Sequence, residues 1–125
     1  MKLLIVDDSN LIRTRIASVV ENTQMQGVSI VGLARNGIEA LKIAEQFAPD
    51  VITMDLTMPE MDGVETIRQL MKLKPTPNIL VVSALKDKST AIMALRLGAR
   101  GFINKPFTDE DLRAALLDMT DHTDA

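Results

Sequence analysis

The sequence contains no cysteine, tryptophan or tyrosine, and it has a single histidine. The absence of cysteine excludes a disulfide framework and thiolate chemistry. Only three phenylalanines supply large aromatic rings, so there are few platforms on which nucleic-acid bases can stack. No apolar run approaches the length of a membrane span, and no secretory leader pattern precedes the first apolar segment. We therefore expect a cytoplasmic protein with no membrane partner and no direct nucleic-acid binding.

The length and amino-acid composition of the chain are typical of one globular domain. The chain has 125 residues, 46% of them hydrophobic and 25% charged, with a formal net charge of −3. This length is sufficient for a hydrophobic core without metal or disulfide cross-links. We expect one domain over residues 1–120, followed by a polar C-terminal tail over 121–125.

Short apolar segments alternate along the chain with longer amphipathic ones. Strands alternating with helices predict an α/β fold with a parallel sheet covered on both faces. Ser9 and Thr108 have the side chains of helix N-caps, and Gly98 has the flexibility of a C-cap. The predicted strands are 3–6, 28–34, 51–54, 78–84 and 101–104, and the predicted helices are 9–23, 37–47, 63–73, 88–98 and 108–119.

Polar side chains follow the predicted strands at the points where the strands end. Ligands of open α/β sheets bind beyond the carboxyl ends of the strands, so these side chains should meet at one edge. Three carboxylates repel one another unless a cation lies among them, and oxygen ligands suit Mg²⁺, for which Mn²⁺ can substitute. In chain order the residues are Asp7, Asp8, Asp55, Ser83 and Lys105.

Asp55 is the residue to which we assign the chemistry. The chain offers no cysteine nucleophile and no evident Ser-His-Asp set, whereas aspartate forms acyl phosphates in known enzymes. Lys105 can neutralise a phosphoryl oxygen, and Ser83 can donate a hydrogen bond to another.

Each of these residues also has a simpler interpretation. Asp7 and Asp8 could be a helix cap, Ser83 a turn residue and Lys105 a solvated surface charge. Phe102 could be an ordinary core residue. The joint occurrence of acids, hydroxyl and lysine at successive strand ends is what favours a phosphoryl site.

Four segments together resemble the receiver domain of two-component response regulators. They are LLIVDDS (3–9), VITMDLTMPEMDG (51–63), LVVSA (80–84) and GFINKPF (101–107). The resemblance covers roughly residues 2–119 and is strongest to the single-domain chemotaxis regulators. It implies a flavodoxin-like, doubly wound (βα)5 fold with a five-stranded parallel sheet of order 2-1-3-4-5.

The resemblance also implies a role for each matching position. Asp55 is similar to the residue that accepts a phosphoryl group from a histidine kinase in a Mg²⁺-dependent reaction. The resemblance implies a phosphoacceptor switch, not an enzyme, that promotes its own phosphorylation and dephosphorylation. The resemblance implies that Asp8, Asp55 and the backbone carbonyl of Thr57 bind the metal directly, and that Asp7 holds it largely through water. Lys105 is similar to the phosphate-binding lysine, and the bond between Lys105 and Pro106 is expected to be cis.

Ser83 and Phe102 resemble the switch residues that respond to phosphorylation. The surface they control would comprise the helix at 88–98, the strand at 101–104 and the helix at 108–119. A downstream protein, such as a flagellar switch component, would recognise it. The well-studied chemotaxis regulators have tyrosine where this chain has Phe102, which lacks the hydroxyl.

Three alternative functions stay open at this point. The chain could be a receiver module cut from a larger regulator with a DNA-binding or methylesterase output domain. It could be a Mg²⁺-dependent phosphohydrolase, although Thr57 stands where such enzymes place a second aspartate. A flavodoxin-like cofactor binder would share the fold, but Asp7 and Asp8 replace the phosphate loop that it needs.

Overall fold

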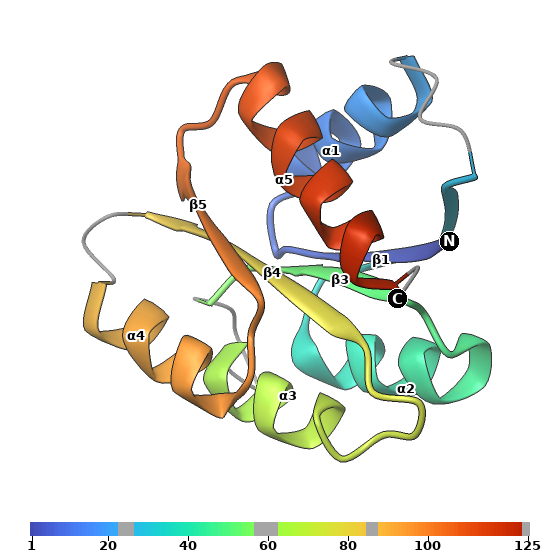
Figure 1. Ribbon diagram of the computed structural model, residues 1–125, viewed down its shortest axis with the longest axis vertical. Helices are drawn as coiled ribbons and strands as arrows, with labels where there is room; N and C mark the ends of the chain where they lie inside the picture. The colour runs from blue at the N-terminus through green and yellow to red at the C-terminus, as the bar shows by residue number, and fades with distance from the viewer. Residues whose placement is uncertain (23–26, 57–62, 85–87, 124–125) are drawn as a thin grey trace.

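A computed structural model describes residues 1–22, 27–56, 63–84 and 88–123 of the chain. Five strands and five helices alternate, and the strands form one parallel sheet of order β2-β1-β3-β4-β5, as predicted (Figure 1). The elements are β1 (Lys2–Val6), α1 (Asn10–Asn22), β2 (Ser29–Ala34), α2 (Gly37–Phe47), β3 (Val51–Met54), α3 (Gly63–Leu70), β4 (Asn78–Ala84), α4 (Lys88–Leu97), β5 (Gly101–Lys105) and α5 (Asp109–Thr123).

Helices cover both faces of the sheet, with α1 and α5 on one face and α2, α3 and α4 on the other (Figure 1). Successive side chains of a strand point to opposite faces, so a strand between two helical layers must be apolar throughout. In β1, Leu3 and Ile5 pack in the α1/α5 core, whereas Leu4 and Val6 pack in the core under α2, α3 and α4. The continuous apolar runs of the sequence are therefore explained by burial on both sides.

The caps of two helices follow the sequence signals. Ser9 Oγ accepts a hydrogen bond from the Ile12 amide at the start of α1. At the start of α5, Thr108 Oγ1 accepts from the Asp111 amide at 3.0 Å, and Asp111 accepts from the Thr108 amide at 3.4 Å. This reciprocal pair is a capping box with aspartate in place of glutamate, and it fixes where α5 begins.

The C-terminal ends of two helices differ from the predicted ones by more than one residue. Helix α3 ends at Leu70 instead of residue 73, and the chain continues in tighter turns in which the Leu73 amide donates to the Leu70 carbonyl. Helix α5 continues to Thr123, beyond the predicted end at Met119, so part of the expected polar tail is helical. No glycine or proline interrupts residues 120–123, and adding residues to an existing helix is much easier than starting one.

Among the described residues, none of the helices combines the length and the apolar character that crossing a bilayer requires.

The centre of the sheet contains one polar side chain without a partner. Thr53 is 1% exposed, and its Oγ1 makes no hydrogen bond within the described part of the chain. Its neighbours on the flanking strands are Ile5 and Leu80, both buried in the α1/α5 core. A buried hydroxyl without a partner destabilises the folded state.

We therefore expect Thr53→Val to stabilise the protein. Valine has the same shape, so the free energy of unfolding in urea should rise by about 1 kcal/mol. Thr66→Val is the matched control, because Thr66 is also fully buried but does have a partner, and this substitution should not stabilise. A loss of stability in Thr53→Val would show that the hydroxyl is satisfied in solution.

Candidate functional site

The two buried aspartates of the site are held by the sheet itself. Asp7 and Asp55 directly follow β1 and β3, which are adjacent and parallel. Hydrogen bonding continues past the strands, because the Asp55 amide donates to the Val6 carbonyl and the Asp7 amide donates to the Ala34 carbonyl, each at 3.0 Å. The backbone at both carboxylates is thus as firmly placed as the strands that lead to it.

Asp7, Asp8 and Asp55 form one group of carboxylates. Oxygens from the three side chains lie within 4.8 Å of one another. Asp7 and Asp55 have side chains that are only 2% and 5% exposed, whereas Asp8 is exposed. The sequence-based prediction that these acids meet at one edge is confirmed.

Lys105 reaches this group from the end of β5. Its Nζ lies 2.8 Å from Asp7 Oδ2 and 3.4 Å from Asp55 Oδ1, and the lysine side chain is 23% exposed. Burial acts to lower the pKa of Lys105, but the hydrogen bond to Asp7 and the charges of Asp55 and Asp7 outweigh it, so the pKa is raised. The lysine is therefore positively charged throughout the neutral range. The Lys105–Pro106 peptide bond is cis, as predicted from the resemblance.

Asp7 also organises the start of α1. Its Oδ1 accepts a hydrogen bond from the Ser9 amide at 2.9 Å, and its backbone carbonyl accepts from Arg13 Nη1 at 2.6 Å. One carboxylate oxygen of Asp7 thus binds the backbone just ahead of α1, while the other contacts Lys105. The cap of the helix is Ser9, so the simpler interpretation of Asp7 as the helix cap is wrong, although Asp7 helps to place the residue that caps α1.

Gly63 brings α3 against the backbone of the site. A Cβ atom there would lie 2.4 Å from the Leu56 Cα and 2.5 Å from the Asp55 carbonyl oxygen. The Gly63 amide donates to the Leu56 carbonyl at 3.0 Å, which fastens the two segments together. Only glycine permits this approach, which explains why position 63 is a glycine.

The other predicted site residues have different outcomes. Ser83 is 1% exposed near the end of β4 and pairs with Asn104, the residue before Lys105. Phe102 is half-buried and packs against the core under α2, α3 and α4. Thr57, the predicted carbonyl ligand, lies outside the described residues.

Sequence reasoning assigned no role to the contacts of Arg13, Arg15 and Gly63. Both arginines flank the apolar stripe of α1, where an arginine is indistinguishable by sequence from a solvated charge. The glycine at position 63 is evident in the sequence, but its closeness to the Asp55 backbone depends on how two elements of the fold pack together.

Comparison with known proteins agrees with this fold. The family model described as the response regulator receiver domain matches residues 3–117. The chain belongs to the response regulator receiver domain family. The receiver-domain fold predicted from the sequence is thereby confirmed.

Relatives of this receiver domain include stand-alone and multidomain proteins. The chemotaxis protein CheY of Listeria monocytogenes is 39% identical over 116 residues, which are 93% of this chain and 95% of that protein. A protein-glutamate methylesterase/protein-glutamine glutaminase of Halalkalibacterium halodurans is 46% identical over 107 residues, 85% of this chain but only 30% of that protein. The response regulator domain of Thermotoga maritima CheB superposes with a TM-score of 0.86 at 31% identity, covering 100% of this chain and 97% of that one.

The residues of the receiver-domain site fit a divalent cation. Three carboxylates face one ammonium group, so the cluster carries a formal charge of −2. All the candidate ligand atoms are oxygens, and the exposed Asp8 leaves the group open to water. Mg²⁺ is bound in proteins by one or two carboxylates while it keeps several waters, and this donor set is of that kind.

Removing the lysine should strengthen cation binding. In Lys105→Ala, no ammonium group competes with the metal for Asp7 and Asp55, so the affinity for Mg²⁺ should rise by about 3- to 10-fold at low salt. Isothermal titration with Mg²⁺ and with Mn²⁺ measures it. Lys72→Ala, which removes an exposed lysine after α3, is the control for net charge. Equal affinities in Lys105→Ala and the unsubstituted protein would mean that Lys105 does not oppose the metal.

Proposed function

We propose that Asp55 accepts a phosphoryl group from the phosphohistidine of a histidine kinase. The observation that carries the proposal is the buried Asp55 carboxylate, grouped with Asp7 and Asp8 and contacted by Lys105. In the transfer, the bond between phosphorus and the imidazole nitrogen breaks and a bond from phosphorus to an Asp55 carboxylate oxygen forms. The donor is the phosphohistidine protonated on its other ring nitrogen, so the histidine keeps that proton and leaves as the neutral imidazole.

The chain's own residues position the reactants and balance their charge. The hydrogen bond from the Asp55 amide to the Val6 carbonyl holds the backbone that carries the carboxylate. Little ordering of Asp55 is therefore needed when the phosphoryl donor arrives. Lys105 supplies up to three N–H donors, and a phosphoryl oxygen would take the place of a carboxylate as one of its partners. Mg²⁺, or Mn²⁺ in its place, held by Asp7, Asp8, Asp55 and the Thr57 carbonyl, would neutralise charge on the phosphoryl oxygens. The same arrangement would promote hydrolysis of the acyl phosphate, which resets the domain.

Phosphorylation would be read on the surface formed by α4, β5 and α5. A phosphoryl group adds negative charge beside Lys105 and Ser83, and the movement of Ser83 toward it would make room for Phe102 to turn inward. Three apolar side chains on α4, Ile92, Met93 and Leu95, are exposed and available to a partner. We propose that the partner acts in chemotaxis signalling in the cytoplasm and is a protein such as a flagellar switch component.

A second candidate has support from the relatives. The similarity to the methylesterase/glutaminase proteins covers less than a third of their length, so this kind of receiver also occurs joined to an output domain. The chain would then control a covalently attached domain instead of a separate protein. Reading the gene beyond the codon for Ala125 distinguishes the two candidates directly.

The acceptor assignment predicts the behaviour of Asp55→Asn. With acetyl phosphate and Mg²⁺, the unsubstituted protein should gain the mass of one phosphoryl group, and Asp55→Asn should gain none, because an amide oxygen is a poor nucleophile. Intact-protein mass spectrometry measures both. Asp118→Asn, an exposed aspartate on α5, is the matched control and should be labelled normally. Labelling of Asp55→Asn at the normal level would refute Asp55 as the acceptor.

A further inference from the structure

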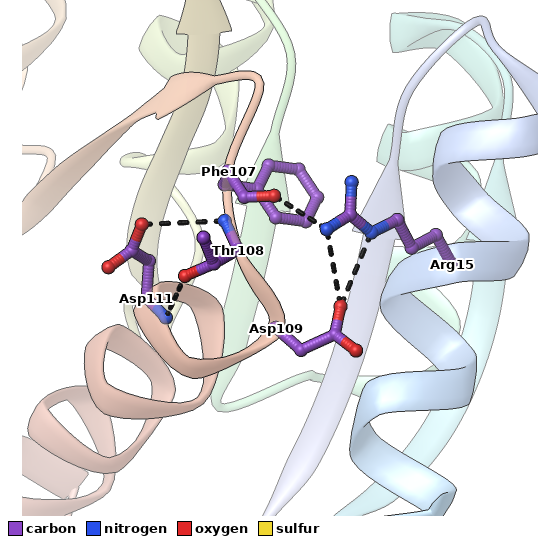
Figure 2. A network of polar contacts seen from close by, with 5 residues as sticks. All are labelled: Arg15, Phe107, Thr108, Asp109 and Asp111. Atoms are coloured by element: carbon purple, nitrogen blue, oxygen red, sulfur yellow. Dashed lines mark hydrogen bonds and ion pairs between the residues drawn. The ribbon is translucent and has the colours of Figure 1, made fainter.

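Arg15 of α1 fastens together two segments that are more than ninety residues apart in the sequence (Figure 2). Its Nη2 donates to the Phe107 carbonyl at 2.6 Å, and its Nη2 and Nε both donate to Asp109 Oδ1, at 3.2 and 3.3 Å. Its guanidinium carbon lies 4.6 Å from the centroid of the Phe107 ring. The Arg15 side chain therefore binds the Phe107 backbone, stacks on the Phe107 ring and pairs with Asp109, the first residue of α5.

This segment begins directly after the lysine of the site. Hydrogen bonding between β4 and β5 is in register as far as the pair Ala84 and Lys105, where β5 ends. Beyond that point the sheet no longer holds the chain, which passes through Pro106 and Phe107 before α5 begins at Asp109. Phe107 is 4% exposed and lies in the α1/α5 core, so its ring gives Arg15 a fixed surface on which to stack.

The other end of the connection is equally close to the site. Helix α1 begins at Asn10, two residues after Asp8, so Arg15 lies on the helix that follows the metal-binding acids. The same helix uses Arg13 to bind the Asp7 carbonyl. The two arginines thus tie α1 to both sides of the charged cluster, Arg13 on the side of the acids and Arg15 on the side of the lysine.

A purely electrostatic role for Arg15 explains less of the geometry. The ion pair with Asp109 is solvent-accessible, since the two side chains are 39% and 68% exposed, and such pairs contribute little to stability. The contacts to the Phe107 carbonyl and ring are the more buried ones, and they act on the chain two residues beyond Lys105. The planar guanidinium is suited to making both of these contacts together.

We propose that Arg15 is a positioning residue that sets where the Lys105 ammonium group lies relative to Asp55. The inference deepens the proposed function and rests on it. In the described part of the chain, Arg15 donates its hydrogen bonds to Phe107 and Asp109 and not to the clustered carboxylates of the site. Arg15 acts through the backbone of the Pro106–Phe107 segment. When Arg15 is lost, Lys105 leaves the position from which it would donate a hydrogen bond to a phosphoryl oxygen.

The test compares the binding of beryllofluoride with the binding of Mg²⁺. Arg15→Met keeps the apolar stem but removes every donor and the charge. At saturating Mg²⁺, the affinity of this variant for beryllofluoride should fall by about 10-fold, the size of effect that loss of an outer-shell partner produces. Its affinity for Mg²⁺ alone should be unchanged or slightly higher, because a displaced lysine competes less for the carboxylates. A parallel fall in both affinities would overturn the proposal, since it would indicate general damage to the site.

Three further variants separate positioning from stability. Arg15→Lys keeps a charge and one donor, and it should recover part of the beryllofluoride affinity. Arg68→Met removes an arginine that pairs with Glu65 on α3, away from the lysine, and should bind as the unsubstituted protein does. In a Lys105→Ala background, Arg15→Met should cause no further loss of beryllofluoride affinity, because it acts through the lysine. Additive losses in the double variant would overturn the inference.

The outcomes also distinguish this inference from the proposed function. If the unsubstituted protein binds no beryllofluoride in the presence of Mg²⁺, the phosphoryl site itself is wrong. If the unsubstituted protein binds and Arg15→Met binds equally well, only the role of Arg15 is wrong. Urea unfolding of each variant shows that the comparison is made between folded proteins.

Discussion

Repulsion among three carboxylates is the constraint around which the site is arranged. Parallel strands all end at the same edge of a sheet, so the fold places Asp7, Asp8 and Asp55 within 4.8 Å of one another. Lys105 offsets one of the three negative charges and contacts the two most buried acids. The remaining charge suits the cluster to a divalent cation, and the phosphoryl site that we propose depends on such a cation.

The remainder of the domain fixes these charges in space. Two apolar layers bury the central strands on both faces, so the strand ends cannot shift without disturbing a packed core. Gly63 lets α3 contact the backbone of Asp55 and Leu56, and Arg13 ties α1 to Asp7. Charge at the edge and apolar packing in the centre are therefore complementary, because a buried ion cluster needs a rigid frame to offset its desolvation.

The proposed output surface is formed by α4, β5 and α5, at one edge of the packed core. Helix α4 makes fewer buried contacts than the strands do, with only Ala91 and Ala94 fully buried among its residues. Three of its larger apolar side chains, Ile92, Met93 and Leu95, are exposed, and β5 contributes half-buried residues such as Phe102 and Ile103. Regions with little buried apolar surface are the ones that rearrange at low energetic cost. The proposed output surface thus combines accessibility with a capacity to change.

The sequence by itself determined the alternation of strands and helices, because apolar period and capping residues are local properties. It also determined which side chains end the strands, and parallel topology alone brings those ends to one edge. The tertiary structure decided the lengths of α3 and α5, the closeness of Gly63 to Asp55, and the contacts that Arg15 makes with Phe107 and Asp109. These features depend on how elements far apart in the chain pack together. In the sequence, an arginine on a helix looks the same whether its side chain faces water or binds the segment that follows Lys105.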